Sequence, residues 1–522
     1  MKHIVKHIEA DIAVIGASLG GVMAAWQAAS AGRKVVLSAE FDWLGGQLTS
    51  QAVPPDEHVL IESGGATESY RRMRAALRRH YLDDPQFSDN SSMTEGCNPG
   101  DGWVSRLCVE PRVAAAYIER LLAPLVDNGS LRILRGTRPT SVAREGRRIV
   151  SALVVDAGGA PTAIDAPWFL DATDTGELLH LAGLPYRLGK EARGEFGEPD
   201  APLVADRLDQ QPVTVVMALR RGTQPTLLET PPGYAFWLRH RLPHYGHLQL
   251  SELIPGSGTG QTVRLPLFGT GDTLDLWRYR RVVCAHNWQP PRAEVSLVNW
   301  AQNDYAIHPL LDGPVAEAAV VRGARELSLC LLHWLRTSGH PDLALAPDVT
   351  GTADGLAQQV YVRESRRVVG LACLSQADIA LGAEGSEGLI PAEPPDSVGV
   401  AWYNMDIHPT CVSGHGVNAR VRPFALPLGS FIARDCDNLI PACKNIGVTH
   451  LVNACTRVHP TEWLIGEVAG LLACFALETG RSLAAIHADS LLVKRFQQRL
   501  RRAGIALAWD RALLAALPLP PH

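Results

Sequence analysis

The chain has 522 residues, of which 46% are hydrophobic and 20% are charged, a composition typical of a globular protein. Its 49 basic and 54 acidic residues give a formal net charge of -5, without the basic excess of proteins that bind nucleic acid or anionic membranes. The first residues, MKHIVKHIEAD, are polar, and no stretch reaches the roughly 20 apolar residues of a membrane span, so we expect neither a secretion signal nor a membrane segment. Ten cysteines without a CxxC pair favour free thiols in a reducing cytoplasm and no metal site.

The chain opens with a strand predicted over 11–15, a glycine turn, a small-residue helix ended by Gly32, and a strand over 34–40. This order predicts a parallel sheet. The turn, GASLGG, has the spacing of a dinucleotide-binding turn, with Ser18 in place of the middle glycine of G-x-G-x-x-G. Ser18 adds only a hydroxyl that can donate to a pyrophosphate, and Glu40, 24 residues beyond Gly16, can bind both hydroxyls of an adenosine ribose. We therefore expect dinucleotide contacts, rather than a glycine turn without a ligand, from Gly16, Ala17, Ser18, Leu19, Gly20, Gly21 and Glu40.

The later elements divide the chain into segments of different character. Helices are predicted over 62–80 and 111–126, strands with a turn over 131–155, and a strand, turn and helix over 166–183. Beyond 186 the helix periodicity weakens, with helices expected near 314–338 and 364–382 and a boundary loop over 383–397. After 425 the pattern of strand, turn and apolar helix returns. We predict a dinucleotide-binding domain made of 1–185 and 425–480, an inserted substrate domain over 186–424, and a helical tail over 481–522.

A second glycine pair follows Glu40 in WLGGQLTS (Trp43–Ser50), and such a loop can cover the pyrophosphate and ribityl chain of FAD, which is longer than NAD. At this point the sequence resembles the glutathione-reductase-type FAD domain and, within it, the xanthan-lyase-like group of bacterial FAD-dependent oxidoreductases. The resemblance covers nearly the whole chain and is carried by GASLGG, WLGGQLTSQAVPPDEH, FLDATDTGELLHLAG, NWAQNDY, VRESRRVVG and NLIPACKNIGVTHLVNACTRVHPTEWLIGEVAG, among others. It implies an α/β fold: a discontinuous, Rossmann-like FAD-binding domain with a parallel sheet, and an inserted mixed α+β substrate domain. It also implies one FAD, and we expect it to be noncovalent because the loop GGQLTSQAV has no flavin-attaching His.

The resemblance assigns further cofactor contacts. Ala172 and Thr173 are small and allow close approach to the adenosine half, while Asp174 either holds a neighbouring loop or caps the helix that follows. Pro139 lies in the segment that resembles the adenine-contacting strand. The remaining cofactor contacts expected from the resemblance are Gly45, Gly46, Gln47, Thr49, Asn445, Gly466 and Glu467.

The segment CTRVHPTEWLIGEVAGLLA is expected to serve the flavin end of the cofactor. Pro460 favours a helix start, and in related flavoproteins the helix at this place directs its N-terminus at the flavin N1 and C2 carbonyl. Arg457 and His459 can add positive charge there, which stabilises a reduced flavin. The alternatives are an ion-pair role for Arg457 and a helix-capping role for His459.

The middle of the chain offers the other candidate catalytic residues. Arg363, Arg366 and Arg367 lie near Glu364, where one arginine can clamp a substrate carboxylate or phosphate, or the arginines can form structural pairs with glutamate. Tyr305 belongs to a polar stretch, NWAQNDY, that suits a substrate wall or a turn, and His408 is a possible base rather than part of a metal site. The candidate catalytic residues are therefore Arg457, His459, Arg363, Arg366, His408 and Tyr305.

The sequence shows no second nucleotide-binding turn, since GSGTG (256–260) follows Pro255 rather than a strand, and it has neither a redox-active cysteine pair nor a W-x-W-x-I-P motif. We therefore expect an enzyme that oxidises or desaturates a small molecule by hydride transfer to flavin N5. The alternatives are a flavin-dependent monooxygenase and a non-catalytic FAD-binding scaffold.

Overall fold

A computed structural model describes residues 5–90, 96–222, 229–256, 261–270, 273–381, 389 and 392–517. Residues 257–260 of the glycine-rich segment, and residues 383–388 and 390–391 of the expected boundary loop, lie outside the described part.

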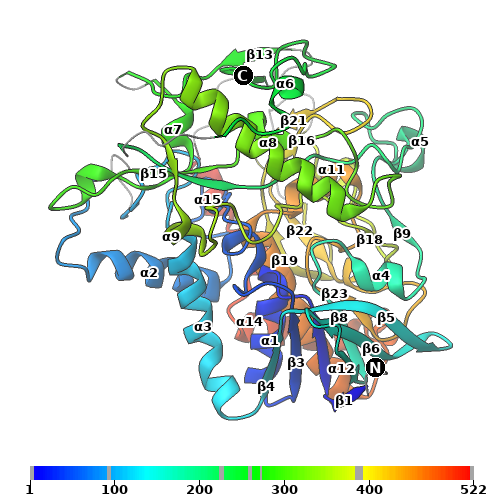
Figure 1. The fold of residues 1–522 in the computed structure, drawn as a ribbon. Coiled ribbons are helices and arrows are strands. Elements are labelled where there is room, and N and C mark those ends of the chain that lie inside the picture. Colours follow the sequence, from blue (N-terminus) through cyan, green and yellow to red (C-terminus); the bar gives the residue numbers. More distant parts are fainter. Residues whose placement is uncertain are drawn as a thin grey trace.

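A five-stranded parallel sheet, in the order β23-β8-β2-β3-β4, forms the base of the molecule (Figure 1). Its strands are short, and all but the edge strand β4 are wholly buried, because helices pack on one face and the second sheet on the other. The strand β23 comes from far along the chain and pairs with β8, so the sheet joins the two ends of the sequence. The α/β class with a parallel sheet is thereby confirmed. The strands are β2 (Ile12–Ile15), β3 (Val35–Ala39), β4 (Leu131–Arg135), β8 (Trp168–Asp171) and β23 (Leu439–Pro441).

Two helices from opposite ends of the chain, α1 (Leu19–Ser30) and α12 (His459–Thr479), pack closely together. Glycines make the approach possible: a Cβ on Gly466 would lie 2.1 Å from the Gly20 carbonyl oxygen, and one on Gly470 would lie 2.4 Å from that of Ala24. The helix α12 is long and apolar enough to cross a membrane, but 94% of its apolar stretch is buried inside the protein. The apolar composition of α12 is therefore that of a helix buried in the core of the protein. The other helices near the sheet are α2 (Glu68–Leu82), α3 (Pro111–Asp127), α4 (Glu177–Leu181), α11 (His450–Thr456), α13 (Leu483–Ala488), α14 (Ser490–Arg502) and α15 (Arg511–Ala515).

A second sheet flanks the first and has the order β1-β7-β6-β5. Its strands β5 and β6 form the hairpin expected between 131 and 155. The bounds are β1 (Lys6–Glu9), β5 (Thr137–Glu145), β6 (Arg148–Asp156) and β7 (Pro161–Asp165).

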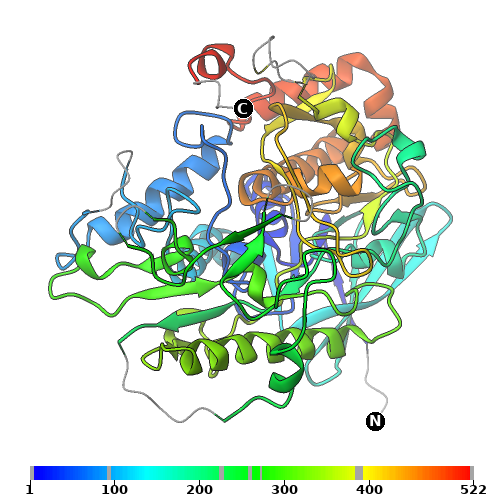
Figure 2. The ribbon, with the colours of Figure 1, turned by 90° about the horizontal axis from the view of Figure 1, so that it is seen from above.

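The middle of the chain packs the long helix α8 (Glu317–Thr337) beside a four-stranded antiparallel sheet, in the order β14-β15-β11-β17. Figures 1 and 2 place α8 and the C-terminal helices on opposite sides of the molecule. Within the described residues, five two-stranded sheets and five short helices complete this part; its division from the rest at 186 and 424 stays a prediction. The bounds are β9 (Tyr186–Arg187), β10 (Val213–Thr214), β11 (Met217–Arg220), β12 (Leu253–Pro255), β13 (Thr262–Arg264), β14 (Arg281–Val283), β15 (Val295–Val298), β16 (Asp304–Tyr305), β17 (Ala344–Leu345), β18 (Arg367–Val368), β19 (Ser397–Ala401), β20 (Met405–Ile407), β21 (Val417–Ala419), β22 (Phe424–Pro427), α5 (Arg193–Phe196), α6 (Tyr234–Trp237), α7 (Leu276–Tyr279), α9 (Pro347–Thr350) and α10 (Gln376–Ile379).

The helix expected over 364–382 is wrong. The segment is extended where β18 pairs with β9, and only α10 is helical. The physical reason is that Arg366 and Arg367 send their buried side chains to different carboxylates, Arg366 to Asp312 and Arg367 to Glu191, rather than along one helix face.

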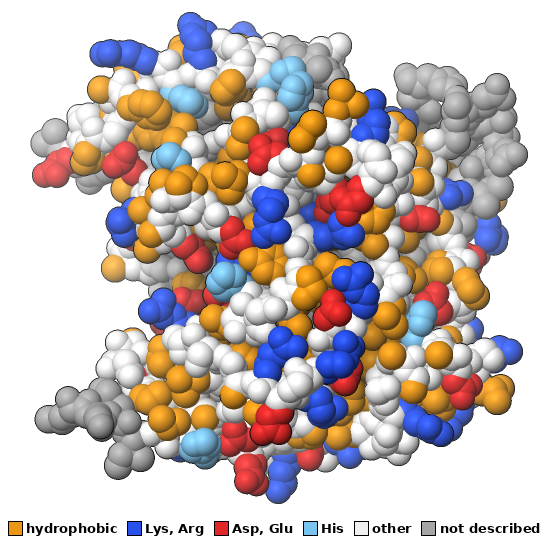
Figure 3. All heavy atoms as spheres, turned by 90° about the vertical axis from the view of Figure 1, so that its right-hand side faces the viewer, with side chains coloured by type: hydrophobic (Ala, Val, Ile, Leu, Met, Phe, Trp, Pro, Cys, Tyr) orange, Lys and Arg blue, Asp and Glu red, His pale blue; other side chains and the backbone are white. Residues whose placement is uncertain are grey.

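Figure 3 shows the side of the molecule that carries α4, α5 and β9. Basic and acidic side chains lie beside one another over this face, as the near-balanced composition leads one to expect.

Candidate active site

The glycine turn after β2 lies against the turn after β8. Gly16 has a φ of +99°, and a Cβ there would lie 2.5 Å from the carbonyl carbon of Ala172. The Gly16 N–H donates to the Ser38 hydroxyl at 3.1 Å, which ties the turn to the end of β3. Because both the backbone conformation and the space exclude a side chain, only glycine fits at this position.

Ser18 is the N-cap of α1, and its hydroxyl oxygen accepts from the Gly21 N–H at 3.2 Å. The departure from the usual glycine therefore satisfies one of the free N–H groups of the helix. Leu19, Gly20 and Gly21 are buried behind the turn, and a Cβ on Gly20 would lie 2.0 Å from the Ala442 carbonyl oxygen. The structure gives Gly20 and Gly21 a role in packing.

A cavity of about 560 Å³, here called the nucleotide cavity, opens at the carboxyl ends of β2, β3 and β8. In open α/β sheets this is the edge at which nucleotides bind. Other lining residues include Ser38, Arg138 and Gln359. Of the residues expected to bind the cofactor, those that line the cavity are Gly16, Ala17, Ser18, Glu40, Pro139, Ala172, Thr173 and Asp174.

Two expected cofactor contacts in α12 are placed elsewhere. Gly466 lies against Gly20, and Glu467 accepts hydrogen bonds from the Gln27 amide at 2.9 Å and the Ser69 hydroxyl at 2.6 Å. Both residues fix α12 to its neighbouring helices, and neither lines the nucleotide cavity. The cofactor contacts that the resemblance suggested here are thus replaced by contacts between helices.

Asn445 and the loop residues Gly45, Gly46, Gln47 and Thr49 are buried beside the nucleotide cavity without lining it. The Asn445 amide donates to the Asp171 carbonyl at 3.0 Å, and the Thr49 hydroxyl donates to the Leu44 carbonyl at 2.7 Å. These bonds hold the loop and the end of β23 in place around the cavity.

A buried ammonium group that the sequence analysis missed lies next to this cavity. Lys444 is fully buried; its Nζ pairs with Asp174 and lies 3.4 Å from a carboxylate oxygen of Glu462. Burial alone would lower the pKa of Lys444, but Asp174, Cys443 and Glu462 raise it well above its usual value, so the ammonium is charged. Asp174 thus holds a lysine rather than only capping a helix.

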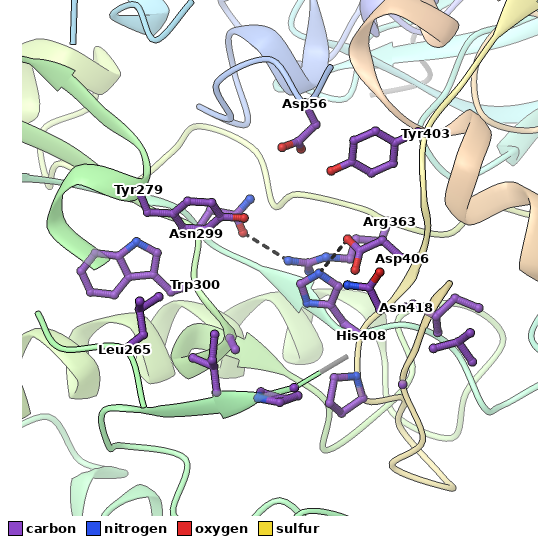
Figure 4. A pocket seen from close by; sticks show the side chains of 18 of the residues that line it. Asp56, Leu265, Tyr279, Asn299, Trp300, Arg363, Tyr403, Asp406, His408 and Asn418 are labelled. Atoms are coloured by element: carbon purple, nitrogen blue, oxygen red, sulfur yellow. Dashed lines mark hydrogen bonds and ion pairs between the residues drawn. The ribbon is translucent and has the colours of Figure 1, made fainter. Parts of the chain in front are cut away.

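A second cavity, of about 390 Å³, lies between the middle of the chain and the segments near Asp56 and Arg457 (Figure 4). We call it the arginine cavity. Aromatic and charged side chains form its wall, among them Asp56, Tyr279, Arg280, Tyr361, Arg363, Tyr403, Asp406, His408 and Arg457.

His408 lies in the wall of the arginine cavity between two carboxylates. Its Nδ1 is 2.5 Å from Asp304 and its Nε2 is 3.4 Å from Asp406. Burial and Arg363 lower the pKa of His408, whereas Asp304 and Asp406 raise it more, so this pKa lies above its usual value. Burial raises the pKa of Asp304, but Arg363 and His408 lower it to about 2, which keeps the carboxylate charged.

Arg457 also lines the arginine cavity. It donates to the Tyr361 hydroxyl at 2.7 Å and to a carboxylate oxygen of Asp406 at 3.1 Å. Burial would lower the pKa of Arg457, but Tyr361 and Asp406 raise it, so the guanidinium is charged. The ion-pair role of Arg457 is thus observed, and its expected role at the flavin stays a prediction.

His459 is the first residue of α12 and does not line either cavity. Its Nδ1 accepts from the Asp56 N–H at 3.1 Å, and its Nε2 lies 3.1 Å from the Val53 carbonyl. Burial lowers the pKa of His459 to about 4, so the ring is neutral at pH 7. The expected positive charge from His459 is therefore wrong, and its role is to anchor the 53–56 segment.

The remaining three candidates differ in placement. Arg363 lines the arginine cavity and pairs with Asp304 at 2.8 Å. Arg366 lies outside this cavity, paired with Asp312 and Glu177, each at 2.9 Å. Tyr305 is in β16 and packs against α8 rather than lining the arginine cavity. Neither Arg366 nor Tyr305 is therefore positioned to contact a ligand in this cavity.

Two chain segments run from one cavity to the other. Ser50 lines the nucleotide cavity and Asp56 the arginine cavity, and the same holds for Gln359 and Tyr361. Between the first pair, Gln51 is fully buried, and neither its amide oxygen nor its amide nitrogen has a partner within the described residues. Unpaired buried amides are costly, so this arrangement fits a polar group bound along the segment.

A family model described as FAD dependent oxidoreductase matches residues 11–500, and no curated protein matches the chain. Among solved structures, a geranylgeranyl bacteriochlorophyll reductase-like protein from Thermoplasma acidophilum is 9% identical, with 96% of this chain and 85% of that chain covered and a TM-score of 0.33. A myxobacterial chondrochloren halogenase is 12% identical, with 95% and 79% covered and a TM-score of 0.31. An L-proline dehydrogenase from P. horikoshii is 16% identical, with 33% of this chain covered and a TM-score of 0.19; this chain spans only 24% of that protein.

Proposed function

The chain belongs to the FAD dependent oxidoreductase family, and we propose that it oxidises or desaturates a small molecule bound in the arginine cavity. FAD, the cofactor of this family, supplies a two-electron acceptor that takes hydride at its flavin N5. The observation that carries the proposal is the hydrogen-bonded pair of His408 and Asp304 in the aromatic wall of the arginine cavity, to which two chain segments lead from the nucleotide cavity.

The residues around the nucleotide cavity fit FAD. Gly16 leaves room for close approach to a pyrophosphate, and Glu40 at the end of β3 suits the ribose hydroxyls. Gln51, with two unpaired amide atoms, suits the polar edge of a ring system that reaches toward the arginine cavity. These positions support one dinucleotide that extends between the two cavities.

His408 is the proposed proton acceptor. Asp304 accepts a hydrogen bond from Nδ1, so Nε2 is the unprotonated nitrogen of the neutral ring, and the Asp406 carboxylate 3.4 Å from Nε2 favours its protonation. With FAD bound as the hydride acceptor, Nε2 of His408 would take the proton that the substrate loses as its C–H bond breaks. Arg457 and Arg363 fix Asp406 and Asp304, and thereby the orientation of the imidazole.

The test exposes the FAD-loaded protein, without oxygen, to a panel of alcohols, polyols, amines and hydroxy acids. Reduction of the bound FAD is measured as the loss of the oxidised flavin absorbance. Reduction by one class without oxygen, abolished in His408→Asn with FAD still bound, supports the proposal. A product that carries an atom from labelled oxygen would contradict it and make the protein a monooxygenase. Failure of every compound to reduce the flavin would favour a non-catalytic scaffold.

A further inference from the structure

The arginine cavity is electrostatically balanced. Although three arginines line it, each is held by a carboxylate, and His408 lies between two of the same carboxylates. Each guanidinium of this wall is therefore already paired with a carboxylate, and only its buried Nε has no partner within the described residues. The pairs are Arg280–Asp56 at 3.2 Å, Arg363–Asp304 at 2.8 Å and Arg457–Asp406 at 3.1 Å.

This balance contradicts the expected arginine clamp for a carboxylate or phosphate. The guanidinium group of Arg363 already donates hydrogen bonds to the Pro212 carbonyl at 2.9 Å, the Thr214 hydroxyl at 2.8 Å and the Asn299 amide oxygen at 3.2 Å. An anionic substrate would have to displace such bonds and would meet the carboxylate of Asp406 as well. Both changes cost binding free energy.

Donors and acceptors instead alternate along the wall. The carboxylate of Asp56 accepts hydrogen bonds and the amide of Asn418 both donates and accepts them (Figure 4). The guanidinium of Arg280, another lining residue, donates them. A hydroxyl group is small and uncharged and both donates and accepts, so neighbouring hydroxyls match neighbouring carboxylates and guanidinium groups.

Aromatic rings provide the apolar part of the same wall. Tyr279 and Trp103 lie with ring centroids 4.4 Å apart, and Tyr361 and Tyr403 also line the cavity. Rings of this kind pack against the C–H face of a compact ligand without requiring charge. The cavity volume of about 390 Å³ lies in the range of small-molecule sites.

We propose that the substrate in the arginine cavity is an uncharged polyhydroxylated ring, of the sugar or cyclic polyol class. That the ligand is a substrate rests on the proposed function, whereas the preference for an uncharged polyhydroxylated ring follows from the residues of the cavity wall alone. Carboxylate–guanidinium pairs recognise the hydroxyls, and the aromatic rings contact the ring face.

The test compares ligands that differ only in charge: methyl pyranosides of gluco and galacto configuration, the corresponding uronides and the corresponding 2-amino sugars. Binding to the FAD-loaded enzyme is measured by equilibrium dialysis, which does not require turnover. A neutral pyranoside is expected to bind about tenfold or more tightly than its uronide and its amino analogue. No binding by any neutral pyranoside, or tighter binding by a charged analogue, would overturn the proposal.

A variant tests the electrostatic reason. Asp56→Asn leaves Arg280 without its carboxylate, so the affinity for the uronide relative to the neutral pyranoside is expected to rise about tenfold. Asp348→Asn, which breaks a surface pair with Arg220, is the matched control and should leave the ratio unchanged. An unchanged ratio in Asp56→Asn with FAD still bound would overturn the proposal. If that variant does not fold, the order of affinities that the wild-type enzyme shows for neutral, anionic and cationic ligands decides the question.

The two proposals fail in different ways. Neutral pyranosides that bind but never reduce the flavin uphold the ligand class and contradict oxidation at this site. Reduction of the flavin by an anion or an amine upholds the oxidoreductase and overturns the ligand class.

Discussion

Arg457→Ala should lower the midpoint potential of the bound flavin. Arg457 carries a buried positive charge in the wall of the arginine cavity, while its partner Asp406 retains its negative charge because His408 also binds it. Loss of a partly desolvated charge interaction of this kind costs about 1–3 kcal/mol. Since roughly 30 mV corresponds to 1.4 kcal/mol for a two-electron couple, the expected decrease is about 20–60 mV.

The assay is a redox titration against a dye of known potential, with FAD content checked in parallel. Arg457→Lys keeps the charge and should recover most of the shift. Arg366→Ala is the matched control, because Arg366 is also paired with two carboxylates but lies outside the arginine cavity. Equal potentials in Arg457→Ala and the parent, or an equal decrease in the Arg366 control, would refute the placement of the flavin near Arg457.

Four further outcomes are expected. Acid precipitation should release free FAD, and flavin that stays with the polypeptide would contradict noncovalent binding. Gly16→Ala should lose FAD because its Cβ would lie 2.5 Å from a backbone atom of the turn after β8, whereas Gly32→Ala, also at positive φ but with open space, should keep it. Glu40→Arg should weaken FAD retention more than Glu40→Gln does, and equal retention would remove Glu40 from the site. Flavin reduction by substrate should rise as pH rises through the elevated pKa of His408, since the neutral ring is the base, and Asp304→Asn should move this rise to lower pH; a profile that stays in place contradicts the role of His408.

The parallel sheet and the nucleotide cavity could be predicted because their signals are local. Gly16, Ser18 and Glu40 fall within one strand–turn–helix–strand unit, whose geometry is nearly fixed by its sequence. The resemblance then extended the prediction to Ala172 and Asp174 in the second turn, and both line the cavity.

The arginine cavity could be predicted only in part, because its wall forms between distant segments that lack periodicity. Asp56 and Arg280 are 224 residues apart and meet only in the folded chain. Arg363 and Arg367, four residues apart, suggested a helix face, but buried arginines that serve different carboxylates impose an extended segment instead. Lys444 gave no signal, since a lysine after an apolar strand usually reaches solvent.

The first site could be predicted because the glycine turn is a contiguous sequence pattern. The charge pairs of the arginine cavity form only on folding, so the sequence did not show them. His408 was found as a candidate because of its neighbours in sequence, and the structure adds the decisive partner, Asp304, from β16.

The most direct test of the account is a crystal structure of the FAD-loaded enzyme. The account predicts the adenosine half in the nucleotide cavity beside Gly16 and Glu40, with the flavin ring passing Gln51 and exposing one face to the arginine cavity. A flavin ring that points away from His408 and Arg457, or a dinucleotide outside the nucleotide cavity, would contradict it.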